Sequence, residues 1–117
     1  MNYLTNRMDA EKRVQKIYGL SLVKLGKPSC SHIYDLSDDF LAEKSKTPEA
    51  RFLAKVKSYF WKLDLLEQKI LIINLLESGM YYPFWYLPDV STKEFNAKEK
   101  SLIVHLICFA DDEGVLA

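Results

Sequence analysis

The densest apolar stretch of the chain lies between Leu65 and Leu76, where eight of twelve residues are Leu or Ile. A surface helix shows one apolar stripe and one polar face, so this density predicts a helix buried on most of its circumference. Asp64 and Glu67 have the spacing of a capping box, and the glycine after Ser78 suits the closing left-handed residue. We therefore expect a capped central helix over about Leu65–Ser78, with Ile73 in the core.

Apolar residues at three- and four-residue spacing predict two long helices before it. The first is expected over Met8–Leu25, after a frayed arm over residues 1–7, and Gly26 supplies its stop. The second is expected over about Pro48–Lys62. Thr47 can cap this helix, and its proline occupies the first helical position, where the missing N–H is of no consequence.

The last long helix is expected over Val90–Gly114. Ser91 and Glu94 have the spacing of a capping box, which places the first turn. Asp111–Glu113 fall at the negative end of the helix dipole, so we expect fraying there before the glycine closes the helix.

A shorter helix is expected through Phe40–Ala42, capped by Ser37 or Asp38. No alternating run of β-branched residues predicts a strand. The sequence thus predicts an all-α fold: a compact bundle of four to six helices with a C-terminal helix-turn-helix-like arrangement. The 117 residues fit a single domain, with N-terminal helices and a loop over 1–46 and the remaining elements over 47–117.

Charge and composition narrow the function classes only slightly. Sixteen basic residues balance sixteen acidic ones, so no overall field favours nucleic acid or an anionic membrane. The apolar run Ile70–Ile73 is too short to span a bilayer, as are the other apolar runs, and no apolar signal segment follows the first Met. We expect a cytoplasmic protein with reduced cysteines and no membrane partner.

Signals for enzyme chemistry are weak. The four glycines are scattered, so no phosphate-binding loop is predicted, and paired aspartates fit caps and solvated ends. Cys30 with His32, and His105 with Cys108, could supply four zinc ligands, but nothing in the sequence brings the two pairs together. We predict no catalytic residues, no metal and no cofactor.

The second half of the chain has the order of a helix-turn-helix: a buried helix, a short piece between prolines, a sharp turn and a capped helix. In that motif the N-terminal residues of the second helix reach the base edges of DNA. The candidate DNA-binding residues are Ser91, Thr92, Lys93, Asn96 and Lys100. Lysine and asparagine pair with guanine and adenine, and hydroxyls bind phosphate. An ordinary exposed helix face explains the same residues.

Five aromatic residues crowd the segment before this helix, where Pro83 can start a short helical piece and Pro88 must end it. They are Tyr81, Tyr82, Phe84, Trp85 and Tyr86. We interpret them as an aromatic plug over the core or as a partner-binding patch, since aromatics concentrate in interface hot spots. A base-stacking platform is a third interpretation, which the lack of interleaved basic residues disfavours.

Residues 57–115 resemble the C-terminal part of the autolysin-regulator (ArpU-like) family of small phage and prophage regulators, which is similar to region 4 of sigma factors. The matching features are the Leu-Asp start of the apolar helix at Leu63, the turn at Leu87, Val90 and Ser91, then Phe95, Lys98 and the run ending in Phe109-Ala110. The resemblance implies a transcription regulator that binds promoter DNA through residues 91–100. The alternative is a helical protein-interaction module without DNA binding, whose partner is RNA polymerase, a sigma-like protein or a second copy.

Overall fold

Helices form all the regular structure in the described part of the chain. The computed structural model describes residues 3–77 and 85–115, and within these ranges it contains seven helical segments and no strand. They are α1 (Tyr3–Lys24), the 3-10 helix η1 (Ile33–Asp35), α2 (Asp38–Glu43), α3 (Pro48–Lys62), α4 (Leu65–Ile70), the π-helical segment η2 (Leu71–Leu76) and α5 (Thr92–Glu113). The predicted all-α class is confirmed.

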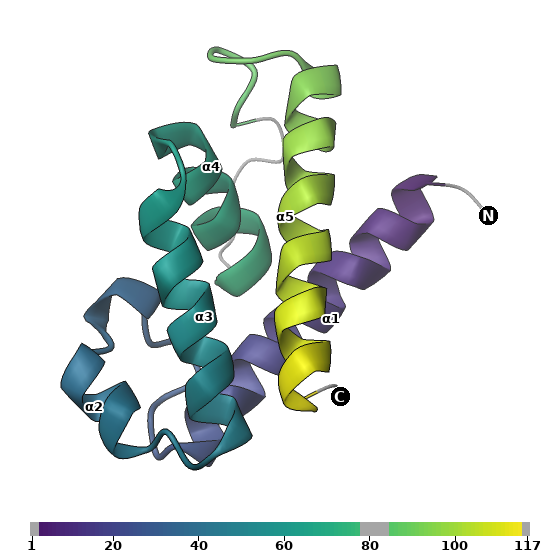
Figure 1. Ribbon diagram of the computed structural model, residues 1–117. Coiled ribbons are helices and arrows are strands. Elements are labelled where there is room, and N and C mark those ends of the chain that lie inside the picture. Colours follow the sequence, from purple (N-terminus) through teal and green to yellow (C-terminus); the bar gives the residue numbers. More distant parts are fainter. Residues whose placement is uncertain (1–2, 78–84, 116–117) are drawn as a thin grey trace.

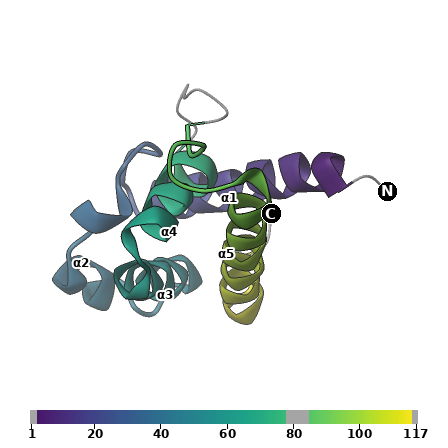
Figure 2. The same ribbon diagram turned by 90° about the horizontal axis from the view of Figure 1, so that it is seen from above.

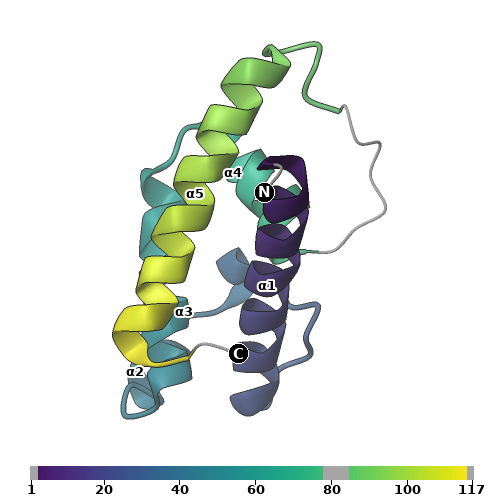
Figure 3. The ribbon, with the colours of Figure 1, turned by 90° about the vertical axis from the view of Figure 1, so that its right-hand side faces the viewer.

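The helices are arranged around α1, which contacts α3, η2 and α5. Figure 1 shows α3 and α5 running side by side with α4 at the upper end of α3. Seen from above in Figure 2, α3 and α5 are close to end-on and α1 runs across them, so the core lies between the pair and α1. Figure 3 shows the outer side of α1 beside α5. No helix in the ranges 3–77 and 85–115 is long and apolar enough to cross a membrane.

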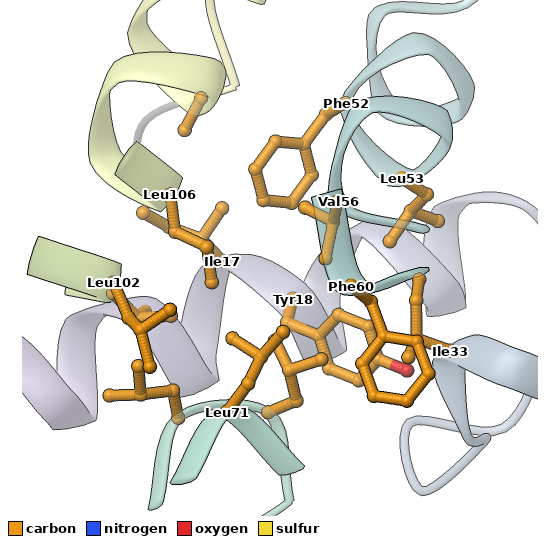
Figure 4. Close-up of a cluster of buried hydrophobic side chains, with 14 of the residues drawn as sticks. Ile17, Tyr18, Ile33, Phe52, Leu53, Val56, Phe60, Leu71, Leu102 and Leu106 are labelled. Atoms are coloured by element: carbon orange, nitrogen blue, oxygen red, sulfur yellow. The ribbon is translucent and has the colours of Figure 1, made fainter. Parts of the chain in front are cut away.

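The core is a cluster of side chains from all the long helices (Figure 4). Leu71 of η2 lies against the ring of Tyr18, with Leu102 and Leu106 of α5 on one side and Val56 of α3 on the other. All five side chains are buried. Burial of each such side chain stabilises the fold by about 1.5–3 kcal/mol, so these apolar contacts hold the helices together.

The predicted starts of α2, α3 and α4 are confirmed by their caps. The Thr47 hydroxyl accepts from the backbone N–H of Ala50 at 3.4 Å, and the Ser37 hydroxyl accepts from that of Phe40 at 3.0 Å. Asp64 and Glu67 form the full capping box, with bonds of 2.8 and 3.3 Å. Each cap satisfies N–H groups that have no partner inside the helix, so short polar motifs fix where these helices begin.

The central helix differs from the prediction in its second half. It is α-helical only over Leu65–Ile70 and then π-helical over Leu71–Leu76, ending with a bond from the Glu77 N–H to the carbonyl of Ile72. The wider π turn changes which side chains face inward. Leu71 and Leu75 are fully buried, but Ile73 is only partly buried, so its prediction as a core residue is wrong. The predicted end at Ser78 and the closing glycine lie outside the described residues.

The first and the last helix are both more regular than expected. α1 begins at Tyr3, so residues 3–7 of the predicted frayed arm belong to the helix, and residues 1–2 lie outside the described residues. α5 continues through Glu113 and closes at Gly114 in the left-handed conformation, without the predicted fraying. The Glu113 carboxylate lies 2.7 Å from Arg51 Nε and 2.9 Å from Lys55 Nζ of α3. These cations lower the pKa of Glu113 and offset the unfavourable negative end of the helix.

The turn before α5 is confirmed, but the described part of the short helical piece is not helical. Residues 85–89 form turns, in which the N–H groups of Asp89 and Val90 both bond to the carbonyl of Tyr86. Pro88 has no N–H to donate, which prevents a regular helix here. The prediction of a helix ending at Pro88 is therefore wrong for residues 85–88.

Candidate functional site

The N-terminal half of α5 carries the predicted DNA-binding residues. Thr92, Lys93 and Lys100 are exposed, and Asn96 is partly buried. The Ser91 hydroxyl is also exposed, but it accepts from the Glu94 N–H at 3.2 Å and so has a structural role as the cap. The structure thus places all five residues within the first turns of one helix.

Lys93, Asn96 and Lys100 lie along one side of α5, because spacings of three and four residues return to the same helical face. Ala97 and Val104 continue this strip and are exposed. We call these five residues the α5 strip. The strip combines two lysine ammonium groups, the amide of Asn96 and the small side chain of Ala97, beside which another molecule can come close to the helix.

The acidic residues of this half of α5 lie off the strip. Glu99 is fully buried, and the exposed Glu94 follows Lys93 by one residue, which turns it about 100° around the axis. Lys98, on the opposite side, reaches Asp64 at 3.9 Å. The positive charge of Lys93 and Lys100 is therefore not neutralised by a neighbour on the strip itself.

Trp85 and Tyr86 hold the start of α5 against the core. Tyr86 is buried and stacks on Phe95 with ring centroids 3.7 Å apart and planes within 8°. Trp85 meets the edge of the same ring at 6.1 Å and is partly buried. Tyr86 is thus a core residue, and its prediction as a partner-binding residue is wrong. The aromatic-plug interpretation holds for both, whereas Tyr81, Tyr82 and Phe84 lie outside the described residues.

A polar cluster inside the bundle, centred on Asn74 of η2, was missed by the sequence reasoning. Asn74 Nδ2 donates to Glu99 Oε2 at 3.0 Å and to Glu11 Oε2 at 3.3 Å, and its Oδ1 accepts from Trp85 Nε1 at 3.2 Å. Its backbone carbonyl accepts from Gln15 Nε2 at 2.8 Å. The cluster joins α1, η2, α5 and Trp85 through one side chain.

Two signals in the sequence point to this cluster. Asn74 interrupts a run of Leu and Ile, and Glu99 falls on the apolar stripe of α5 between Phe95 and Leu102. A buried polar group normally requires a polar partner, so each of these two residues indicates that a partner exists elsewhere in the chain. Only the tertiary structure shows that Asn74 and Glu99 are partners, since 25 residues separate them.

A second polar contact ties the loop after α1 to the end of η2. His32 Nδ1 lies 2.7 Å from Glu77 Oε2, and the hydroxyl of Tyr18 donates to the carbonyl of Ser31 at 2.6 Å. The hydrogen bond to Glu77 raises the pKa of His32, and the nearby negative charge of Asp35 acts in the same direction.

This contact gives folding a defined pH dependence. A raised pKa in the folded state means that the stabilisation is fully present below about 6.5, the ordinary histidine value, and is lost as pH rises through the folded value. Replacing His32 by Gln should therefore lower the free energy of unfolding at pH 5.5 and have less effect at pH 8.5. Denaturant titrations at both pH values measure this difference. Equal effects at the two pH values would contradict the charged contact, and Glu77→Gln should reproduce the result.

The potential zinc ligands are used for other contacts or are exposed. Cys30 and Cys108 are both exposed. His105 lies 2.8 Å from the Ser101 carbonyl and stacks on Tyr59 at 4.9 Å. In the described part of the chain, no three His, Cys, Asp or Glu side chains are grouped as a metal site would require.

Comparison of the chain with protein-family models, with curated proteins and with solved structures finds no match.

Proposed function

We propose that the chain is a transcription regulator of phage type that binds promoter DNA through the α5 strip. The observation that carries this proposal is the exposure of Lys93 and Lys100 on one helical face from which the acidic neighbours are turned away. Such a face can enter a major groove, where lysine contacts guanine or phosphate and Asn96 can contact adenine. The resemblance of residues 57–115 to ArpU-like regulators supports the same function.

The electrostatics set the expected strength of binding. Phosphate neutralisation supplies most of the nonspecific affinity for DNA, and each neutralised phosphate adds about 0.9 to the slope of log K against log salt. The strip offers two lysines, and the chain has no net charge. We therefore expect binding that depends on salt with a shallow slope and relies on the fit of α5 to a preferred sequence.

The test is a selection from random duplex DNA followed by binding titrations over a salt series. Lys93→Glu and Lys100→Glu should each weaken binding about tenfold and make the salt slope shallower by about one. Lys69→Glu, an exposed lysine on α4, is the matched control with the same charge change and should stay within about twofold of wild type. The proposal fails if no sequence is enriched, or if the control variant loses as much affinity as the two strip variants.

The alternative function, a helical protein-interaction module, loses its original basis at Trp85 and Tyr86 because both pack on the core. A different surface of the bundle favours a protein partner, and it is independent of the α5 strip.

A further inference from the structure

A groove of about 670 Å³ lies between α2 and the outer face of α3. Its floor includes Leu41 and Ala50, which are buried, and small side chains line it along α3, including Ala54 and Ser58. Trp61 borders the groove with 61% of its surface exposed. A large indole left this accessible beside a hollow lined by small residues provides an apolar anchor point for another molecule.

Among the described residues that line this groove, basic side chains outnumber acidic ones. They include Arg51, Lys57 and Lys62 and one acidic residue, Asp38, although the charge of Arg51 is paired with Glu113. Lys57 Nζ lies 2.8 Å from Asp38 Oδ1, yet the Lys57 side chain is 15% exposed and that of Asp38 is 92% exposed. The lysine is therefore held in the groove wall while its partner is solvated, so an incoming carboxylate can compete for the lysine.

Arg51 differs from the two lysines, because its guanidinium group is already bonded to other residues of the chain. Its Nε lies 2.7 Å from Glu113, and Nη1 donates to the Ser45 carbonyl at 2.9 Å. It closes one end of the groove as a fixed cation. Lys57 and Lys62 are left as the groups that can meet negative charge on a ligand.

We propose that this groove docks an acidic, amphipathic helical segment of a partner protein. The wall runs from Ala50 to Lys62, thirteen residues whose twelve steps span about 18 Å at 1.5 Å per residue, which matches three to four turns of a bound helix. A large apolar side chain of the segment packs on Trp61 and Ala54, and its carboxylates pair with Lys57 and Lys62. The favourable charge arrangement supplies specificity for acidic partners.

The groove and the α5 strip are separate surfaces. α3 contacts α5 through Tyr59, whose ring packs on His105 and Phe109. Tyr59 lies on the opposite side of α3 from Ala54 and Trp61, given 3.6 residues per turn. The docking proposal therefore does not rest on DNA binding, and each can fail without the other.

The experiment is a selection from a displayed library of helical 16-residue peptides on the full-length chain. Enriched peptides are expected to carry Glu or Asp along one face and Trp, Phe or Leu along the other. Fluorescence titration of the enriched peptides should show binding weakened about tenfold by Trp61→Ala and by Ala54→Glu, since a central anchor is lost or the groove is filled and made acidic. Lys69→Glu is the control for charge and should leave affinity within about twofold.

Circular dichroism and thermal unfolding of each variant separate lost docking from lost folding. Both altered side chains are exposed, so the variants should fold like wild type. The proposal is overturned if no peptide is enriched, if the enriched peptides are neutral or basic, or if they bind Trp61→Ala and wild type equally. It is also overturned if self-association or duplex DNA, rather than an acidic peptide, protects the groove in amide hydrogen exchange.

Discussion

Leu71→Asp is expected to abolish cooperative folding of the chain. Leu71 is fully buried in η2 against Tyr18, between α3 and α5. Removing a leucine from such a position costs about 2–5 kcal/mol, and an unpaired buried carboxylate adds about 3–5 kcal/mol. The sum is comparable with the entire stability of an ordinary domain, about 5–15 kcal/mol. Thermal unfolding followed by circular dichroism should show no sharp transition.

The same substitution at Leu65 is the matched control. Leu65 is 68% exposed at the first position of α4, where a carboxylate also meets the positive end of the helix. Leu65→Asp should therefore change stability by less than about 1 kcal/mol. Cooperative unfolding of Leu71→Asp near the wild-type midpoint would show that η2 is not the centre of the core. Ile73→Asp is a weaker test, because Ile73 is only partly buried.

Asn74→Leu is expected to destabilise the fold by about 2–4 kcal/mol. Leucine has nearly the shape of asparagine but cannot donate to Glu99 or accept from Trp85 Nε1. Glu99 is fully buried, so loss of this donor weakens the compensation for its desolvation. Urea titration of wild type and variant measures the difference.

A double variant separates the buried carboxylate from simple loss of packing. Replacing Asn74 and Glu99 together by Leu removes the polar pair in favour of apolar groups. The double variant should be more stable than Asn74→Leu by about 1–3 kcal/mol, because a buried polar group with reduced pairing is worse than none. If the two substitutions simply add their losses, the cluster acts through shape rather than through its hydrogen bonds.

The helix starts could be predicted because they depend on local chemistry. Thr47 before Pro48 and Asp64 before Glu67 place caps on N–H groups within three residues, so no distant part of the chain is needed. The apolar spacing likewise predicted the two long helices α1 and α3. Periodicity requires only the geometry of one helix.

The errors in the prediction arise where distant residues act on a local preference. The acidic end of α5 was expected to fray, but Arg51 and Lys55 of α3 lie within 3 Å of Glu113 and stabilise it. The π turn of η2 moved Ile73 partly out of the core, and no local motif marks such a turn. Tyr86 was proposed as a contact residue because aromatic density alone does not distinguish a plug from a patch.

The sequence by itself determined the helical class, the capped starts of α2, α3, α4 and α5, and the exposure of Lys93 and Lys100, since helix propensity, capping and amphipathic spacing are local properties. The tertiary structure alone decided that Asn74 meets Glu99, that Tyr86 stacks on Phe95, and that α2 and α3 enclose a basic groove beside Trp61. Those features depend on contacts between residues brought together by packing, and the hydrophobic effect that drives packing is not directional. Which distant residues meet is therefore determined by how all the helices fit together.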